Sequence, residues 1–188
     1  EDRSATMDVA VVFGPGAEKH NAVPGALSYI DPRLPELGVR VLTPAGQAGK
    51  MLGLPEAPLA DYESLRLSLG VPDGSRDLPV EKALLLESGF DELNGVDWKK
   101  GCYMGQELTA RTKYRGLVKK RLFPVKVEGA LPAPGTAIER NGEEVGEIRS
   151  GAGNRALAML RLEALEGALT AGGARIVPQK PDWMKLPD

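Results

Sequence analysis

The sequence predicts an α+β protein that ends in a small antiparallel β-barrel. Short apolar, β-branched runs, each closed by a turn signal, occur at residues 9–13, 26–30 and 39–43. Helical patterns occur at residues 61–69 and 106–113. From about residue 117 the pattern changes to about five short strands in roughly 70 residues, which favours a closed or nearly closed barrel.

The N-terminal part reads as strands and turns. Val9–Phe13 meets Gly14-Pro15-Gly16, which is typical of a buried strand that ends in a turn. Ala26–Ile30 and Val39–Thr43 follow the same pattern. The glycines around Lys50 are too close together for a phosphate-binding loop, and no Ser or Thr follows the lysine. We therefore expect a glycine-rich turn into a short helix there.

The segment Asp61–Leu69 has the pattern of a helix. Asp61 is a suitable N-cap, and Gly70 is a suitable stop signal. Arg66 lies on a different face from the apolar residues of this helix. Two interpretations of Arg66 stay open, a solvated arginine and a contact for an anionic ligand.

The barrel strands are predicted one by one. Leu122–Val127 reads as a strand that Pro124 confines to a sheet edge or a bulge. Asn141-Gly142 is the strongest hairpin signal in the chain. Ala156–Leu162 is apolar on both faces, so it should be a central strand, and Arg175–Val177 should be the last one.

Composition excludes several classes of protein. The 188 residues, 42% hydrophobic and 27% charged, fit an ordinary globular protein of one large or two small domains. No apolar run reaches about 18 residues, and no signal-peptide pattern opens the chain. A single cysteine excludes an internal disulfide and fits a reducing compartment. The chain opens on charged residues without Met, so we expect a fragment or a processed product.

The segment 99–121 contains most of the residues that suggest a functional site. It holds eight basic residues and one acidic residue, in a chain whose net charge is −2. Such a segment is either a solvated helix face followed by a basic strand, or a site for a polycarboxylate, a phosphate or nucleic acid. Its basic residues are Lys99, Lys100, Arg111, Lys113, Arg115, Lys119, Lys120 and Arg121.

Cys102, the only cysteine, lies between Gly101 and Gly105 just before the predicted helix. The helix dipole and the two preceding lysines favour the thiolate form of its side chain. The alternative is a buried cysteine that acts as a small apolar residue. His20 is the only histidine and lies far away in sequence, so no Cys–His nucleophile pair is evident. One cysteine cannot hold zinc or an iron–sulfur cluster by itself.

Residues 100–107 read KGCYMGQE, and Ala110-Arg111 follows. This segment resembles the K-G-C-Y-x-G-Q-E…R signature of the YgfZ-type folate-binding proteins. They are relatives of the glycine-cleavage aminomethyltransferase, and they include mitochondrial factors that help mature [4Fe–4S] proteins. Leu-Pro-Val-Glu at 78–81, the start of the terminal domain at 119–122 and the strand at 156–160 support the resemblance.

The resemblance implies two domains. Residues 1–116 would be the C-terminal part of an aminomethyltransferase-like folate-binding domain, and residues 117–188 would be the C-terminal β-barrel. Family members carry a further N-terminal part that completes the first domain. We expect that part to exist as a separate chain or to have been lost by proteolysis.

The resemblance also implies a function and a site. It predicts a tetrahydrofolate-binding accessory protein that supports assembly or repair of iron–sulfur enzymes, including tRNA-modifying ones. Its location would be cytoplasmic, or the mitochondrial matrix in a eukaryote. Cys102 would be the functional thiol, and no metal would be bound by this chain alone. The folate contacts would be Lys100, Tyr103, Gln106, Glu107 and Arg111, with Arg66 and Glu81 as further ones.

Two other functions remain open at this point. A folate-dependent one-carbon transferase would share the fold, but the motif of the transferase relatives lacks the cysteine, so aminomethyl transfer is not assigned. An RNA-binding module would use the basic segment through its phosphate contacts. Only Tyr103 and Tyr114 could stack on bases there, and the rest of the chain is acidic, so direct nucleic-acid binding is disfavoured.

Overall fold

The computed structural model describes residues 2–186. The chain divides into two compact units, Glu1–Tyr62 and Glu63–Asp188. Among the described residues, no helix is both long and apolar enough to cross a membrane.

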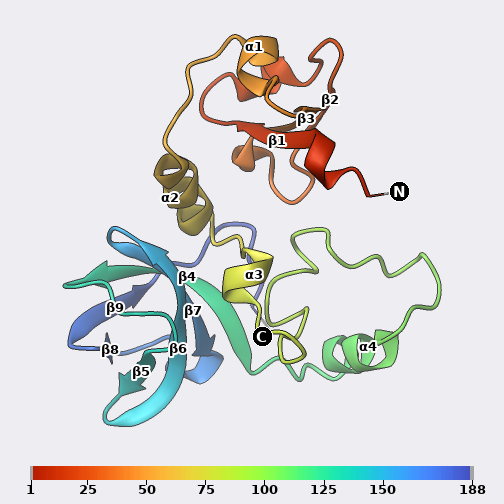
Figure 1. The fold of residues 1–188 in the computed structure, drawn as a ribbon. Helices are drawn as coiled ribbons and strands as arrows, with labels where there is room; N and C mark the ends of the chain where they lie inside the picture. Colours follow the sequence, from red (N-terminus) through yellow and green to blue (C-terminus); the bar gives the residue numbers. More distant parts are fainter. Residues whose placement is uncertain (1, 187–188) are drawn as a thin grey trace. The chain divides into compact units, whose positions relative to one another are not determined.

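The first unit is built on a three-stranded antiparallel sheet with strand order β1-β3-β2 (Figure 1). All three predicted strands are present, and residues such as Val12, Val39 and Val41 form the core beneath them. The short helix expected after the glycine-rich turn is α1. The elements are β1 (Met7–Val12), β2 (Leu27–Ile30), β3 (Val39–Pro44), α1 (Ala48–Leu52) and the 3-10 helices η1 (Ser4–Thr6), η2 (Ala17–His20) and η3 (Pro35–Leu37).

A buried carboxylate closes one end of this sheet. The Asp31 side chain is only 1% exposed, and it pairs with Arg33 and Arg40 at 2.8 Å each. Burial by itself would raise the pKa of Asp31. The hydrogen bonds from Arg33 and Arg40 outweigh that effect and lower the pKa to about 2. Asp31 therefore stays ionised in the folded protein at neutral pH.

Helix α2 (Leu59–Leu69) joins the two units and begins earlier than predicted. The N–H of Asp61 donates to the carbonyl of Pro58 at 3.0 Å, so Asp61 lies in the first turn and is not the N-cap. A carboxylate is favourable in a first turn because the helix dipole is positive there. The short helix α3 (Gly74–Asp77) follows and is capped by Asp73, whose side chain accepts from the N–H of Ser75.

Six antiparallel strands of the second unit close into a barrel in the order β4-β7-β6-β5-β8-β9 (Figure 1). The predicted barrel is thus confirmed, with one strand more than the about five expected. The core inside it consists of apolar side chains such as Phe123, Ile138 and Leu160. The strands are β4 (Lys120–Glu128), β5 (Ala137–Arg140), β6 (Glu143–Ala152), β7 (Arg155–Arg161), β8 (Leu169–Ala171) and β9 (Ala174–Pro178), and η4 (Leu162–Ala164) follows β7.

Local sequence signals position these strands correctly, with two exceptions. Asn141 and Gly142 have φ angles of 55° and 82°, as a tight hairpin turn requires. β7 is buried between β4 and β6, as its apolar sequence indicated. The three-residue strand β8 was not predicted. The edge position expected for Pro124 is wrong, because β4 pairs on both sides. Pro124 lies where pairing with β9 ends, and its carbonyl accepts from Gln179 at 2.9 Å.

Candidate functional site

Helix α4 (Gln106–Tyr114) carries the second half of the cysteine motif, as the sequence predicted. Gly105 precedes it with φ 87°, and Gly101 has φ 93°. A side chain at either position would meet no atom within 4 Å. The two glycines are therefore required for the path of the backbone and not for space. They make the loop that presents Cys102 turn sharply into the helix.

A cluster of side chains holds this loop and α4 in place. Asp91 accepts hydrogen bonds from Trp98 Nε1 at 2.7 Å and from Lys113 Nζ at 2.6 Å. The Lys113 ammonium also lies 4.2 Å from the centre of the Trp98 ring. Burial opposes ionisation of Asp91, but the bonds from Lys113 and Trp98 prevail and lower its pKa. The residue that begins the loop is thus fixed to the last turn of α4.

The motif residues also contact one another. The Gln106 side chain accepts a hydrogen bond from the backbone N–H of Tyr103 at 3.2 Å. The Lys100 ammonium lies 5.1 Å from the centre of the Tyr103 ring. Glu107 and Arg111 form the predicted i, i+4 ion pair, with 2.6 Å between Glu107 Oε1 and Arg111 Nη2. The segment therefore brings five of the predicted site residues onto one loop and the helix that follows it.

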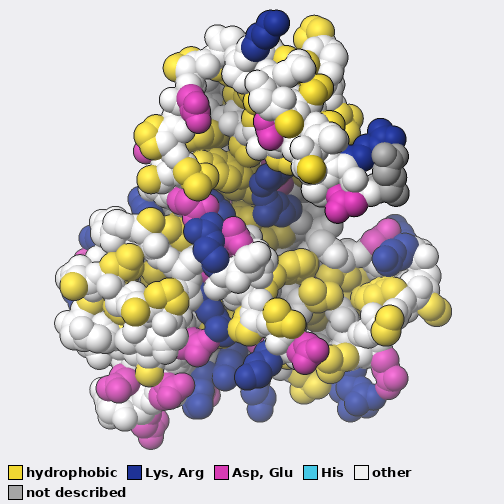
Figure 2. All heavy atoms as spheres, in the orientation of Figure 1, with side chains coloured by type: hydrophobic (Ala, Val, Ile, Leu, Met, Phe, Trp, Pro, Cys, Tyr) yellow, Lys and Arg dark blue, Asp and Glu magenta, His cyan; other side chains and the backbone are white. Residues whose placement is uncertain are grey.

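Cys102 is exposed, so the buried alternative is wrong. Its surroundings are partly apolar, since Met104 is 100% exposed and Leu108 is 56% exposed. A groove of about 190 Å³ lies between α4 and residues 83–86, and Tyr103, Met104 and Leu108 contribute to its walls. In Figure 2, apolar side chains are exposed over the α4 region, and basic side chains lie along the lower border of the view.

Not all of the eight basic residues are available to a ligand. Arg111 pairs with Glu107, Lys113 pairs with Asp91, and the buried Arg121 pairs with Glu92 at 2.9 Å. Within residues 2–186, the remaining five form no ion pair at 4.0 Å or less. They are Lys99, Lys100, Arg115, Lys119 and Lys120. Two of these five immediately precede Gly101-Cys102 in the sequence.

Arg66 is neither solvated nor available to a ligand. It is 4% exposed, and all five of its N–H donors are engaged. Nη1 bonds Asp77 at 2.9 Å and the carbonyl of Val71 at 2.8 Å, and Nη2 bonds Ser150 Oγ at 2.9 Å. Nε and Nη2 also bond Glu63. These contacts fix α2 to α3 and β6, and no donor is left for a folate carboxylate.

Glu81, the other residue suggested for folate, lies in an exposed turn with φ 62°. It does not line the groove beside the cysteine motif, whose other wall is formed by residues 83–86. That groove is smaller than the roughly 300–1,000 Å³ usual for a cofactor site. The described residues therefore bring the cysteine motif together without forming a complete folate pocket around it.

Sequence reasoning missed the residues that hold this site. The spacing of Asp91, Trp98 and Lys113 follows no recognisable motif, and neither does the pairing of Arg66 with Asp77.

Among residues 2–186, no group of three His, Cys, Asp or Glu side chains is placed to hold a metal ion.

The chain is similar to several known proteins. Residues 119–186 match the family model described as the C-terminal β-barrel domain of CAF17. The chain is 44% identical to the mouse mitochondrial iron–sulfur cluster assembly factor IBA57 over 172 residues, which is 81% of this chain and 46% of the relative. It is 41% identical to human IBA57 over 184 residues, which is 90% of this chain and 51% of the relative.

This chain resembles the IBA57-type iron–sulfur assembly factors. It spans about half the length of the IBA57 proteins that it matches. The fold has a solved counterpart in the glycine cleavage aminomethyltransferase T of Bartonella henselae, with a TM-score of 0.61 and 17% identity. That match covers 78% of this chain and 46% of the other, and at this identity it shows the fold alone. The aminomethyltransferase-like fold and the resemblance to mitochondrial iron–sulfur maturation factors are thus confirmed, whereas a YgfZ-type relationship stays a prediction.

Proposed function

We propose that this chain is part of an accessory protein for iron–sulfur cluster assembly, in which Cys102 is the functional thiol. The observation that carries the proposal is the exposure of the only cysteine on a loop fixed at both ends. The similarity to IBA57 supports it, because those relatives are named iron–sulfur cluster assembly factors. One thiol supplies too few ligands for a cluster, so the remaining ligands come from a partner.

The surface around the thiol suits a protein partner. Met104, two residues after Cys102, and Leu108 in the first turn of α4 expose apolar surface, and Lys99 and Lys100 form no ion pair with any other described residue. An interface with an apolar centre and a charged rim favours a partner of opposite charge and speeds its association. We therefore expect an iron–sulfur carrier or client enzyme with an acidic rim, and tRNA-modifying enzymes are among the clients to examine.

The test compares Cys102→Ala with Lys180→Ala in the full-length protein. Both side chains are exposed, so each variant should keep its free energy of unfolding within about 0.5 kcal/mol of the wild type. Each variant is expressed in a strain that lacks the gene, and the activity of a [4Fe–4S] enzyme is measured. We expect Cys102→Ala to fail to restore that activity and Lys180→Ala, which changes a residue of the tail after β9, to restore it. Full restoration by Cys102→Ala would show that the thiol is dispensable.

Tetrahydrofolate binding is a separate proposal for the whole protein. The glutamate tail of a folate is anionic, and unpaired cations such as Lys100 could bind it, but the described residues do not complete a pocket. Calorimetry with tetrahydrofolate should therefore detect binding to the full-length protein and little binding to this chain. If neither binds, the folate proposal is wrong while the role of Cys102 is unaffected. Turnover of the folate would favour the one-carbon transferase.

We propose a mitochondrial location, because both IBA57 relatives are mitochondrial factors. Fractionation of cells that express the tagged full-length protein tests it directly.

A further inference from the structure

The groove beside the cysteine motif runs along one face of α4. The helix side of the groove is formed by Gly105, Leu108, Thr109 and Thr112, which lie on one face because they are spaced by a helical turn. These residues cover about two turns, or roughly 10 Å of the helix axis. Residues 83–86 form the opposite wall. A groove of this length that is too small for a cofactor suits the side chains of a partner protein.

The wall formed by residues 83–86 is held by the barrel. Before this wall, Asp77 accepts a hydrogen bond from the backbone N–H of Ser150 on β6 at 2.9 Å. After it, the carbonyl of Glu87 accepts from the N–H of Leu122 on β4 at 2.8 Å. A segment attached at two points keeps the groove preformed, and a preformed site loses less conformational entropy on binding.

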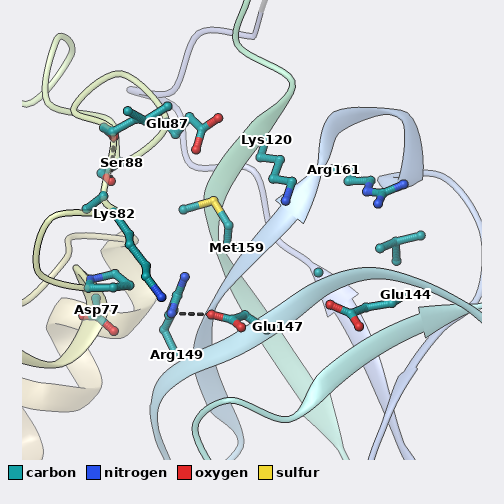
Figure 3. A pocket seen from close by; sticks show the side chains of 15 residues that line it. Asp77, Lys82, Glu87, Ser88, Lys120, Glu144, Glu147, Arg149, Met159 and Arg161 are labelled. Carbon is teal, nitrogen blue, oxygen red and sulfur yellow. Dashed lines mark hydrogen bonds and ion pairs between the residues drawn. The ribbon is translucent and has the colours of Figure 1, made fainter. Parts of the chain in front are cut away.

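The barrel side of the same segment is occupied by charges that compensate one another. Residues 83 and 84 also line a cavity of about 410 Å³ between the segment and the barrel, which Figure 3 shows. In this cavity Arg149 pairs with Glu147, and Lys120 faces Glu87. Lys120 is therefore not counted among the cations that are free to meet a partner.

The groove exposes apolar surface that a partner would cover. Leu108 and Leu85, one from each wall, are 56% and 37% exposed, and Met104 is 100% exposed. The flexible thioether side chain of methionine adapts to the shape of a partner. Tyr103 also contributes to the wall, and its buried hydroxyl has no hydrogen-bond partner within residues 2–186. A carbonyl or carboxylate oxygen of an occupant would supply the missing acceptor.

Unpaired positive charge lies at the start of the groove. The Lys100 ammonium is 5.1 Å from the centre of the Tyr103 ring, which is part of the wall. Neither Lys99 nor Lys100 forms an ion pair with another described residue. The one carboxylate close by is that of Asp97, which accepts a hydrogen bond from the backbone N–H of Lys99 at 2.8 Å. Two cations therefore face one carboxylate at this end.

Unpaired positive charge also lies at the far end of α4. Arg115 is the C-cap residue of the helix, and Lys119 directly precedes β4. In the part of the chain that the structure describes, neither forms an ion pair. Between the two ends, the charge of Glu107 is neutralised by Arg111. The groove is thus apolar in the middle and positive at both ends.

We propose that this groove docks an acidic segment of the iron–sulfur partner, with apolar side chains in the groove and carboxylates on both sides of them. The apolar side chains contact Met104 and Leu108, and the carboxylates contact Lys100 at one end and Arg115 at the other. An apolar anchor inside a charged rim combines affinity with choice of partner. The inference rests on the proposed function, because it specifies the partner that meets Cys102.

The test measures how three fluorescent peptides bind to the full-length protein at low salt, by fluorescence anisotropy. The first, acetyl-EEDLLFDEE-amide, has the proposed pattern. The second, acetyl-QQNLLFNQQ-amide, lacks the charges, and the third, acetyl-EEDSGSDEE-amide, lacks the apolar centre. We expect the first peptide to bind at least about tenfold more tightly than either of the others. Equal affinities for the three peptides, or no binding of the first at millimolar concentration, would overturn the inference.

Variants locate the binding surface. Leu108→Ser and Lys100→Gln should each weaken binding of the first peptide about tenfold. Leu59→Ser is the matched control for the leucine, because Leu59 is a 76% exposed helical residue that does not line the groove. Lys180→Gln, in the exposed tail, is the control for the lysine. Both controls should bind the peptide as the wild type does, and an equal loss in a control and its matched variant would contradict the proposed surface.

Cys102→Ala separates this inference from the proposed function. It should bind the first peptide like the wild type, because Cys102 does not line the groove. In the strain that lacks the gene, Leu108→Ser should restore less [4Fe–4S] enzyme activity than Leu59→Ser. Full restoration by Leu108→Ser would overturn the docking role and leave the role of Cys102 intact. Full restoration by Cys102→Ala would instead overturn the proposed function, and with it the identity of the partner, even if the peptides bind.

Discussion

Asp77→Asn would remove a charge from the centre of the network that joins α2 and α3 to the barrel. The Asp77 side chain is completely buried. Its Oδ2 atom accepts from Arg66 Nη1 at 2.9 Å and from the backbone N–H of Asp73 at 2.7 Å. Its Oδ1 atom accepts from the N–H of Ser150 at 2.9 Å. Three parts of the second unit therefore depend on this one carboxylate.

The cost of the substitution follows from these contacts. Asparagine can still accept from Ser150, but its NH₂ group would then point at two donors, Arg66 and Asp73. Removing one partner of a buried ion pair costs about 3–5 kcal/mol, because the other charge stays buried without compensation. Glu63 still pairs with Arg66 at 3.0 Å, so we expect the lower end of that range, about 3 kcal/mol.

Urea unfolding followed by tryptophan fluorescence measures this loss of stability. Both tryptophans, Trp98 and Trp183, lie in the second unit, so the fluorescence reports the unfolding of that unit. Asp182→Asn is the control, since Asp182 is exposed, and its effect should stay within about 0.5 kcal/mol. A loss below about 1 kcal/mol for Asp77→Asn would refute the structural role assigned to Arg66, and it would reopen Arg66 as an anion contact.

Two further predictions concern pH. The lowered pKa of Asp31 contributes stability that is present above its ordinary pKa of 3.8 and is lost as the pH falls toward 2. Asp31→Asn should remove roughly 1–2 kcal/mol of this contribution, allowing for solvent around its arginine partners, and circular dichroism of urea unfolding at pH 6 and pH 2.5 tests it. An unchanged pH dependence would contradict the assignment. The pH dependence expected from Glu87 runs in the opposite direction. Burial raises the pKa of Glu87, so its contribution to stability is present at low pH and is lost as the pH rises through the raised pKa. Glu87→Gln should therefore raise the melting temperature at pH 7 and leave it nearly unchanged at pH 4. An equal change in melting temperature at the two pH values would contradict the raised pKa of Glu87.

The fold could be predicted from sequence where local signals determine it. The hairpin at Asn141-Gly142 needs two residues with positive φ, and Asn followed by Gly is the residue pair that adopts these angles most readily. The run 156–162 is apolar on both faces, which only a strand covered on both sides tolerates. The start of α2 was misplaced by two residues, because Asp61 suits a first turn as well as an N-cap. Pro124 was misplaced because the position of β9, which decides the matter, is set about 50 residues later.

The site was harder to predict, because burial depends on residues far away in the sequence. Arg66 is covered by contacts from residues as distant as Ser150, and nothing near Arg66 in the sequence signals them. The exposure of Cys102 was likewise undecided, since free cysteines are more often buried than exposed. In contrast, the Glu107–Arg111 pair was predictable, because helical spacing by itself places the two side chains together.

The pairing of charges changes what the basic segment can do. A count of eight cations suggested a broad anion-binding surface, but Arg111, Lys113 and Arg121 are engaged by carboxylates of this chain. Lys113 and Arg121 use their charge to attach α4 and β4 to residues 91 and 92. Lys99 and Lys100, which directly precede the cysteine loop, remain unpaired among the described residues. Arg115, Lys119 and Lys120 also form no ion pair among the described residues, so the unpaired positive charge of the segment lies in two places, directly before the cysteine loop and directly after α4.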